Sequence, residues 1–142
     1  TMPLMMLRAS SFYYADQPWV AYRQRGNSIL ATPNLGKALD QARSLEAFRA
    51  ALKTSDCAGH AQVQLALAHQ SARNFIGAMR WLDKQKQGEL TDRRALAQRL
   101  LQDFLASAPL SPQALVKVYG RKGWWLRRAR LQACLRQVDC WN

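Results

Sequence analysis

The stretch from about residue 58 to about residue 86 constrains the fold most, because it reads as one long amphipathic helix. Apolar residues recur along it at steps of three and four and form one continuous seam: Ala61, Leu65, Ala68, Ala72, Phe75, Ile76, Met79 and Leu82. A helix of this length spans on the order of 40 Å. Because such an apolar seam has to be buried, we expect a helical bundle built around this helix.

Two more segments show the same periodicity. Residues 34–53 carry leucine and alanine at three- and four-residue steps, and the start of this helix is predicted within residues 32–34. Residues 92–107 repeat the pattern with a leucine-rich stripe. Ser55 and Asp56 have side chains that can accept bonds from free helical amides, so we expect them to cap the long helix.

The last part of the chain predicts a pair of helices. Ser111 and Pro112 are typical of a helix start, and they precede a short helix predicted over residues 112–119. Gly120 is predicted to end that helix in a left-handed conformation, and a basic helix is predicted over residues 124–138. Together with the preceding helix, their order and lengths match a helix-turn-helix unit, whose final helix would enter the major groove of DNA.

The first third of the chain, residues 1–33, is the least regular. It is rich in aromatic and β-branched residues, and Gly26-Asn27 is a turn signal, so we expect an irregular or hairpin-like arm whose rings pack over helices. No internal repeat or low-complexity linker separates the chain into parts. The prediction is therefore a mainly α single domain over 1–142, with this arm followed by a bundle of about five helices over 34–142.

The charge of the chain favours anionic partners. Lys and Arg total 21 against 9 Asp and Glu, which gives a formal net charge of +12. Between residues 110 and 142 seven basic residues face a single acid, Asp139. The long helix is also basic at its far end, through Arg73, Arg80, Lys84 and Lys86, a pattern typical of a solvated helical face. Nucleic acid is the commonest polyanionic partner, although such a charge also serves solubility or docking on an acidic protein.

The last two predicted helices and their turn supply the candidate binding residues. Cations for phosphate contact are Arg121, Lys122, Arg127, Arg128, Arg130 and Arg136. Trp124 or Trp125 would stack on a base or anchor a protein partner. Adjacent positions on a helix point about 100° apart, so we expect one tryptophan in the core and the other partly exposed.

The helical wheel of the last helix shows two apolar stripes. One side gathers Trp124, Leu131, Cys134, Leu135 and Val138, and the side nearly opposite carries Leu126, Ala129 and Ala133. The arginines fall between them. We therefore expect a helix packed on two sides with its guanidinium groups along the edges, which favours phosphate tracking over base reading by a recognition helix.

Four residues offer a possible zinc site. Cys57 and His60 have chelating spacing, and Cys134 and Cys140 could complete a tetrahedron. Their spacing is imperfect, because six residues separate the last two cysteines on a continuous helix. Small buried cysteines are the favoured interpretation, and no cofactor is predicted.

Nothing in the sequence indicates an enzyme or a membrane protein. There are two histidines, the carboxylates are scattered, and neither a phosphate-binding glycine loop nor a nucleophile elbow is present. No stretch approaches the roughly 20 apolar residues of a membrane span, and the apolar run at the start is too short for a signal sequence. With an odd number of cysteines, three, the prediction is a cytoplasmic protein.

The sequence thus predicts a non-enzymatic nucleic-acid-binding protein. It would use the basic, tryptophan-containing C-terminal surface and act as a regulator or as a small subunit of a nucleoprotein complex, on DNA or RNA. The alternative is a helical adaptor or chaperone that docks on an acidic protein.

Overall fold

The computed structural model describes residues 8, 9, 11, 34–85 and 93–140. These ranges hold five helices: α2 (Leu35–Lys53), α3 (Ala61–Lys84), α4 (Arg93–Ser107), α5 (Pro112–Arg121) and α6 (Trp125–Cys140). The described part of the chain contains no strand, so the predicted mainly α bundle is confirmed. The predicted N-terminal arm, apart from three of its residues, lies outside the described residues.

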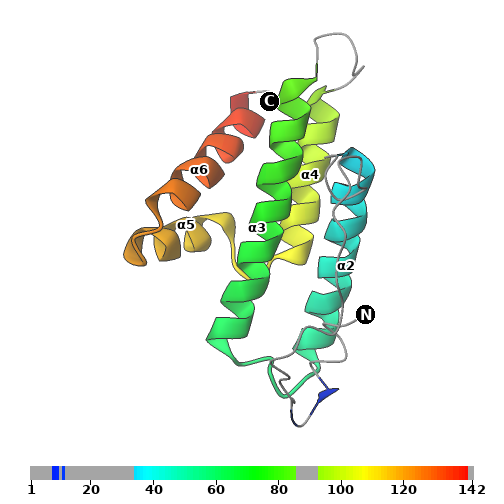
Figure 1. Cartoon of the computed structure of the whole chain (residues 1–142), viewed down its shortest axis with the longest axis vertical. Coiled ribbons are helices and arrows are strands. Elements are labelled where there is room, and N and C mark those ends of the chain that lie inside the picture. The colour runs from blue at the N-terminus through cyan, green and yellow to red at the C-terminus, as the bar shows by residue number, and fades with distance from the viewer. Residues whose placement is uncertain (1–7, 10, 12–33, 86–92, 141–142) are drawn as a thin grey trace, which may run out of the picture.

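The long helix α3 runs through the middle of the fold. Figure 1 shows α4 behind it, α2 on one side and α6 on the other, while the short α5 runs across the direction of α3. The side chains buried between these helices come mostly from α3, α4 and α6, and include Ala68, Phe75, Met79, Leu82, Leu100, Phe104, Leu131 and Val138. Phe75 and Phe104 stack with their ring centroids 5.2 Å apart. The amphipathic seam predicted for α3 is thus the spine of the core.

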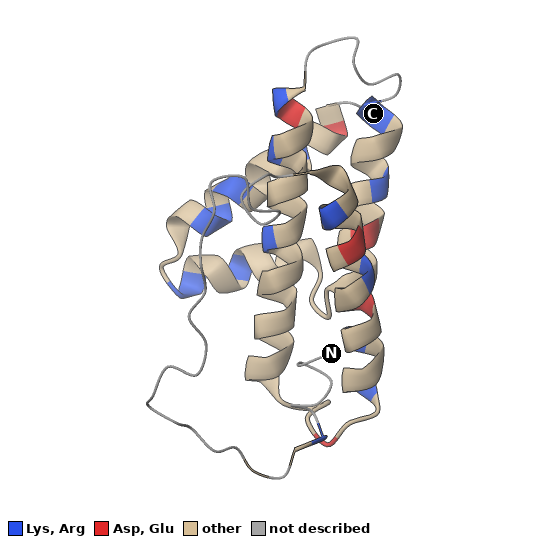
Figure 2. Ribbon diagram, turned by 45° about the vertical axis from the view of Figure 1, so that its right-hand side comes forward, with Lys and Arg blue, Asp and Glu red and all other residues tan. Residues whose placement is uncertain are grey.

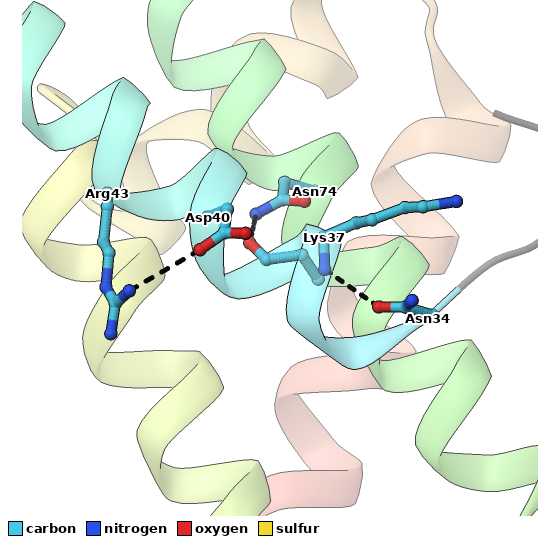
Figure 3. A network of polar contacts seen from close by, with 6 residues as sticks. Asn34, Lys37, Asp40, Arg43 and Asn74 are labelled. Atoms are coloured by element: carbon cyan, nitrogen blue, oxygen red, sulfur yellow. Dashed lines mark hydrogen bonds and ion pairs between the residues drawn. The ribbon is translucent and has the colours of Figure 1, made fainter. Parts of the chain in front are cut away.

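Hydrogen bonds fix α2 on the bundle. Asn34 caps the helix by accepting a bond of 3.0 Å from the Lys37 amide, which confirms the predicted start (Figure 3). The Asn74 side chain of α3 donates to the Ala38 carbonyl at 2.8 Å, and the Arg49 guanidinium donates to the Ala106 carbonyl in the last turn of α4 at 2.6 Å. These bonds set the spacing between α2 and its two neighbours.

The cap predicted for α3 is wrong. The helix begins at Ala61, after His60, and no side chain caps it. The Ser55 hydroxyl instead donates to the Leu52 carbonyl at 2.9 Å. The end of α2 is the helix end closer to Ser55, because a turn of several residues separates Ser55 and Asp56 from the first amide of α3.

The start of α5 is as predicted, but its end is not. Ser111 accepts a bond of 3.2 Å from the Ala114 amide, and Pro112 fills the first helical position. Gly120 stays helical, and the left-handed residue is Gly123, with φ of 69°. The left-handed residue therefore lies three positions after the predicted Gly120, and the helix ends at Arg121, two residues later than predicted.

Two hydrogen bonds explain why Gly123 ends the helix. Its amide donates to the Gly120 carbonyl at 3.1 Å, and the Trp124 amide donates to the Tyr119 carbonyl at 2.9 Å. This pair of bonds is a Schellman motif, in which the residue after the glycine packs on the residue that accepts its amide bond. The Tyr119 and Trp124 rings do so, with centroids 5.8 Å apart. The motif places Trp124 over the core and starts α6 at the next residue.

Candidate nucleic-acid interface

Three rings meet where the α5–α6 turn lies against α3. We call His69, Tyr119 and Trp124 the aromatic corner. His69 packs edge-on against Tyr119 at 5.7 Å between centroids and lies 5.8 Å from the Trp124 ring. The His69 Nδ1 atom and the Tyr119 hydroxyl are 2.7 Å apart. The corner therefore joins α3, α5 and the start of α6 through one hydrogen bond and three ring contacts.

The electrostatics of the corner favour the neutral form of both hydrogen-bonded groups. Burial raises the pKa of Tyr119 to about 12, so the phenol keeps its proton. Burial, with the nearby guanidinium groups of Arg127 and Arg73, lowers the pKa of His69, which favours the neutral ring. Two neutral groups therefore share this hydrogen bond, and the tautomer of His69 decides which of them donates. The described charged groups around the corner are the flanking lysine and arginine side chains.

Cations flank the Trp124 ring. The Arg127 guanidinium lies 4.4 Å from the ring centroid, and the Lys122 ammonium lies 5.5 Å from it. The ring is half-buried and packs against the core cluster. Because the Trp124 ring is half-buried and flanked by cations, little of its surface is open to a base. The flanking cations, Lys122 and Arg127, are two predicted phosphate-contact residues beside the aromatic corner.

The neighbouring tryptophan points outward. Trp125 is 62% exposed, and the Arg128 guanidinium lies 5.6 Å from its ring centroid. The prediction that one tryptophan packs on the core while the other is exposed is therefore confirmed. Of the two predicted stacking rings, Trp125 is the one that a ligand can reach.

Arg128 reaches back across α5 toward Gly120. A Cβ atom at Gly120 would lie 3.2 Å from one guanidinium nitrogen of Arg128, so a larger residue would displace that side chain. Together with Lys117 and Arg121, these two residues line a shallow hollow of about 520 Å³. We call this feature the cationic hollow. Lys117 and Gly120 are not among the site residues predicted from the sequence, because their proximity to Arg128 depends on how α6 folds back on α5.

The remaining predicted cations do not share one face of α6. Arg130 and Arg136 are both exposed, but they are about 120° apart around the helix. The stripe of Leu126, Ala129 and Ala133 is also exposed, and Leu126 reaches 63%. The expectation that α6 packs on two sides is thus wrong. Its neighbours α3 and α4 bury only the side of Leu131, and no described element covers the other.

Within the described residues, no acidic side chain neutralises the positive charge around this turn. Figure 2 shows basic positions gathered at the α5–α6 turn without an acidic position among them. The sequence has no Asp or Glu between Asp103 and Asp139. In the described ranges the predicted cations of this region make no ion pair, whereas Arg43 pairs with Asp40 on α2 at 3.5 Å. As far as the described residues go, the region is therefore a positive surface without paired acids, and it carries an exposed indole ring.

The structure does not bring the four possible zinc ligands together. The described residues contain no group of three or more His, Cys, Asp or Glu side chains that could hold a metal ion. Cys134 is buried in α6, Cys140 is exposed at its end, and Cys57 lies in the turn before α3. Burial raises the pKa of the Cys134 thiol, as expected for a small apolar core residue.

Comparison of this chain with protein-family models, curated proteins and solved structures finds no match. None of the helices in the described ranges is both long and apolar enough to cross a bilayer.

Proposed function

We propose that this protein binds nucleic acid through the α5–α6 turn and α6, without chemistry of its own. The observation that carries the proposal is the exposed Trp125 ring beside Arg128 and the cationic hollow, in a region without carboxylates. An aromatic ring among unpaired cations is the usual arrangement for stacking a base while holding the backbone. The protein would serve as a regulator or as a small subunit of a nucleoprotein assembly.

The cations have distinct roles in this proposal. Arg121 and Arg128, with Lys117, form the hollow and would receive a phosphate group. Lys122 and Arg127 lie against Trp124, a position that restricts their conformations and lowers the entropic cost of fixing them on a ligand. A net charge of +12 would speed the encounter and make binding dependent on salt.

The arrangement favours contact with the backbone over reading of base edges. A recognition helix presents several polar side chains on one exposed face. On α6 the outward face carries Leu126, Ala129 and Ala133, and the arginines lie on different sides. We therefore infer sequence-tolerant binding, in which phosphate contacts supply most of the affinity.

A protein partner is the second candidate, and the exposed apolar stripe of α6 favours it. Leu126 is 63% exposed and lies directly after Trp125, which is 62% exposed. An apolar stripe edged by arginines suits an acidic partner with an apolar centre. A Leu126→Ser variant would then lose the partner, whereas phosphate-driven binding of an oligonucleotide would not change.

The test is fluorescence anisotropy of labelled single-stranded and duplex oligonucleotides, DNA and RNA, with the wild-type chain at several salt concentrations. Nucleic-acid binding predicts that log affinity falls linearly with log salt, with a slope of about 0.7 per phosphate on a single strand. The absence of binding at low salt by folded protein would reject the proposal and favour the protein partner.

A further inference from the structure

A second basic concavity lies away from the α5–α6 turn, between α2 and α3. It has a volume of about 930 Å³, and four cations line it: Lys37 from α2, and Arg73, Arg80 and Lys84 from α3. The amides of Asn74 and Gln70 add polar groups. We call it the α2–α3 groove. Sequence reasoning assigned its arginines to an ordinary solvated face, because the contribution of α2 is visible only in three dimensions.

The α3 cations form a row. Arg73, Arg80 and Lys84 follow one another at steps of seven and four residues, so they lie on one side of the helix. The row is about 16 Å long at 1.5 Å per residue. All three side chains are exposed, and none makes an ion pair within the described ranges.

The row also connects the groove to the first site. Arg73 lies close enough to His69 to act on its charge, and so does Arg127 from α6. Farther along α3, the Arg80 guanidinium lies close enough to the Cys134 thiol of α6 to influence its pKa. Figure 1 shows α3 between α6 and α2, so the row is positioned to join the aromatic corner to the α2–α3 groove.

Carboxylates near the groove are engaged elsewhere. Asp40 of α2 pairs with Arg43 (Figure 3), and Asp83 of α3 accepts a bond of 3.0 Å from Gln137 of α6. Neither lines the groove. The groove therefore keeps an excess of positive charge that an anionic ligand would neutralise.

The floor of the groove has room for a ligand. Gly77 lies between Arg73 and Arg80 along the row, and a Cβ atom built there meets no atom within 4 Å. Trp81, half-buried against the core, contributes an aromatic surface to the lining. Cations along a row, open space and a partly accessible ring are the features of a channel for single-stranded nucleic acid.

We propose that the α2–α3 groove is a second segment of the nucleic-acid path and that the ligand is single-stranded. A strand bound at the cationic hollow and Trp125 would continue past Arg73 and place its phosphates on Arg80 and Lys84. A flexible single strand can follow surfaces on three helices that run in different directions. This inference rests on the function proposed for α6, and it adds a separate prediction about ligand length.

Gly77 provides a sharp test. In Gly77→Glu a carboxylate would stand four residues from Arg73 and three from Arg80, where it would pair with both and oppose phosphate. Gly77→Ala is the matched control, since both changes remove a helical glycine and both are expected to favour the helix. Circular dichroism and urea unfolding would show that both variants fold.

The readout is anisotropy with single strands of two lengths. A strand of about 5 nucleotides would reach only the α6 site, whereas one of about 20 would also fill the groove. We expect Gly77→Glu to weaken the long strand about 25-fold at about 0.1 M salt, if two contacts are lost at a slope of about 0.7 each. The short strand and Gly77→Ala should behave as in wild type.

The outcomes separate the two proposals. If wild type binds the long strand and an Arg121→Glu/Arg136→Glu variant weakens it while Gly77→Glu matches Gly77→Ala, the groove is not part of the path. If duplex binds as tightly as the long single strand and Gly77→Glu leaves both unchanged, the single-strand path is also rejected. If wild type binds neither strand, both the groove and the function proposed for α6 fail.

Discussion

The Nδ1 atom of His69 on α3 lies 2.7 Å from the hydroxyl of Tyr119 on α5. Burial and the nearby Arg127 and Arg73 favour neutral imidazole, and burial favours neutral phenol, so the two groups form one uncharged donor and acceptor pair. The pair anchors α5 on the long helix. It also holds the face of Tyr119 against which Trp124 packs.

This pair makes stability depend on pH. The pKa of His69 is lower in the folded chain than its ordinary value of about 6.5, so below that pH the unfolded chain binds the proton more readily. The contribution of the neutral His69 ring to the free energy of unfolding is fully present above about pH 6.5, and it is lost as pH falls through the pKa of His69 in the folded chain. We expect the free energy of unfolding, measured in urea, to decrease between about pH 7.5 and about pH 5.5.

The matched control for this effect is His69→Gln, which retains His60 and every other titrating group. Its unfolding free energy should change less over the same pH range than that of wild type. Equal pH dependence in the two proteins would contradict the neutral pair.

Alanine substitutions at Gly123 and Gly77 should change the free energy of unfolding in opposite directions. Gly123→Ala forces a side chain into φ of 69° and is expected to destabilise the fold by about 1–2 kcal/mol. Gly77→Ala adds a methyl group to open space within a helix and is expected to stabilise it by about 0.5–1 kcal/mol. Thermal and urea unfolding of both variants measures the difference, and a neutral Gly123→Ala would rule out its role in the Schellman motif.

Alanine substitutions at the two adjacent tryptophans should separate an effect on stability from an effect on nucleic-acid binding. Trp124→Ala removes a half-buried ring from the core edge and is expected to cost about 2–3 kcal/mol of unfolding free energy. Trp125→Ala, at 62% exposure, should stay within about 0.5 kcal/mol of wild type. In oligonucleotide titrations Trp125→Ala should weaken binding by about 1–3 kcal/mol, the usual contribution of one stacked base. Unchanged affinity would remove Trp125 from the site.

Periodicity and caps predicted much of this fold. The apolar steps of three and four placed all five described helices close to their observed bounds, because a helix in a small bundle has to bury one face. Asn34 and Ser111 could be assigned as caps since each has its amide partner three residues ahead. Helix periodicity and caps depend on residues that are near one another in the chain, so both can be recognised in a single sequence.

Features that depend on distant contacts were harder to predict. The choice between Gly120 and Gly123 as the helix end depends on the packing of Trp124 on Tyr119, which also involves α3. The wheel of α6 identified two apolar stripes but not how many neighbours the helix has. The cationic hollow and the α2–α3 groove combine residues from separate segments, so their cations appeared in the sequence only as scattered surface charges.

In the proposed function, the α5–α6 region binds nucleic acid through specific cations and not through net charge alone. Two double variants with the same change in charge test it: Arg121→Glu/Arg136→Glu in the α5–α6 region, and Arg94→Glu/Arg99→Glu on α4. All four arginines are exposed, so both variants should fold. The comparison is the affinity for a labelled single strand as a function of salt.

We expect Arg121→Glu/Arg136→Glu to weaken binding at least about tenfold and to lower the salt slope by about 1.4, while Arg94→Glu/Arg99→Glu stays close to wild type. Equal losses in the two variants would mean that overall charge alone drives binding, and the proposed site would be wrong.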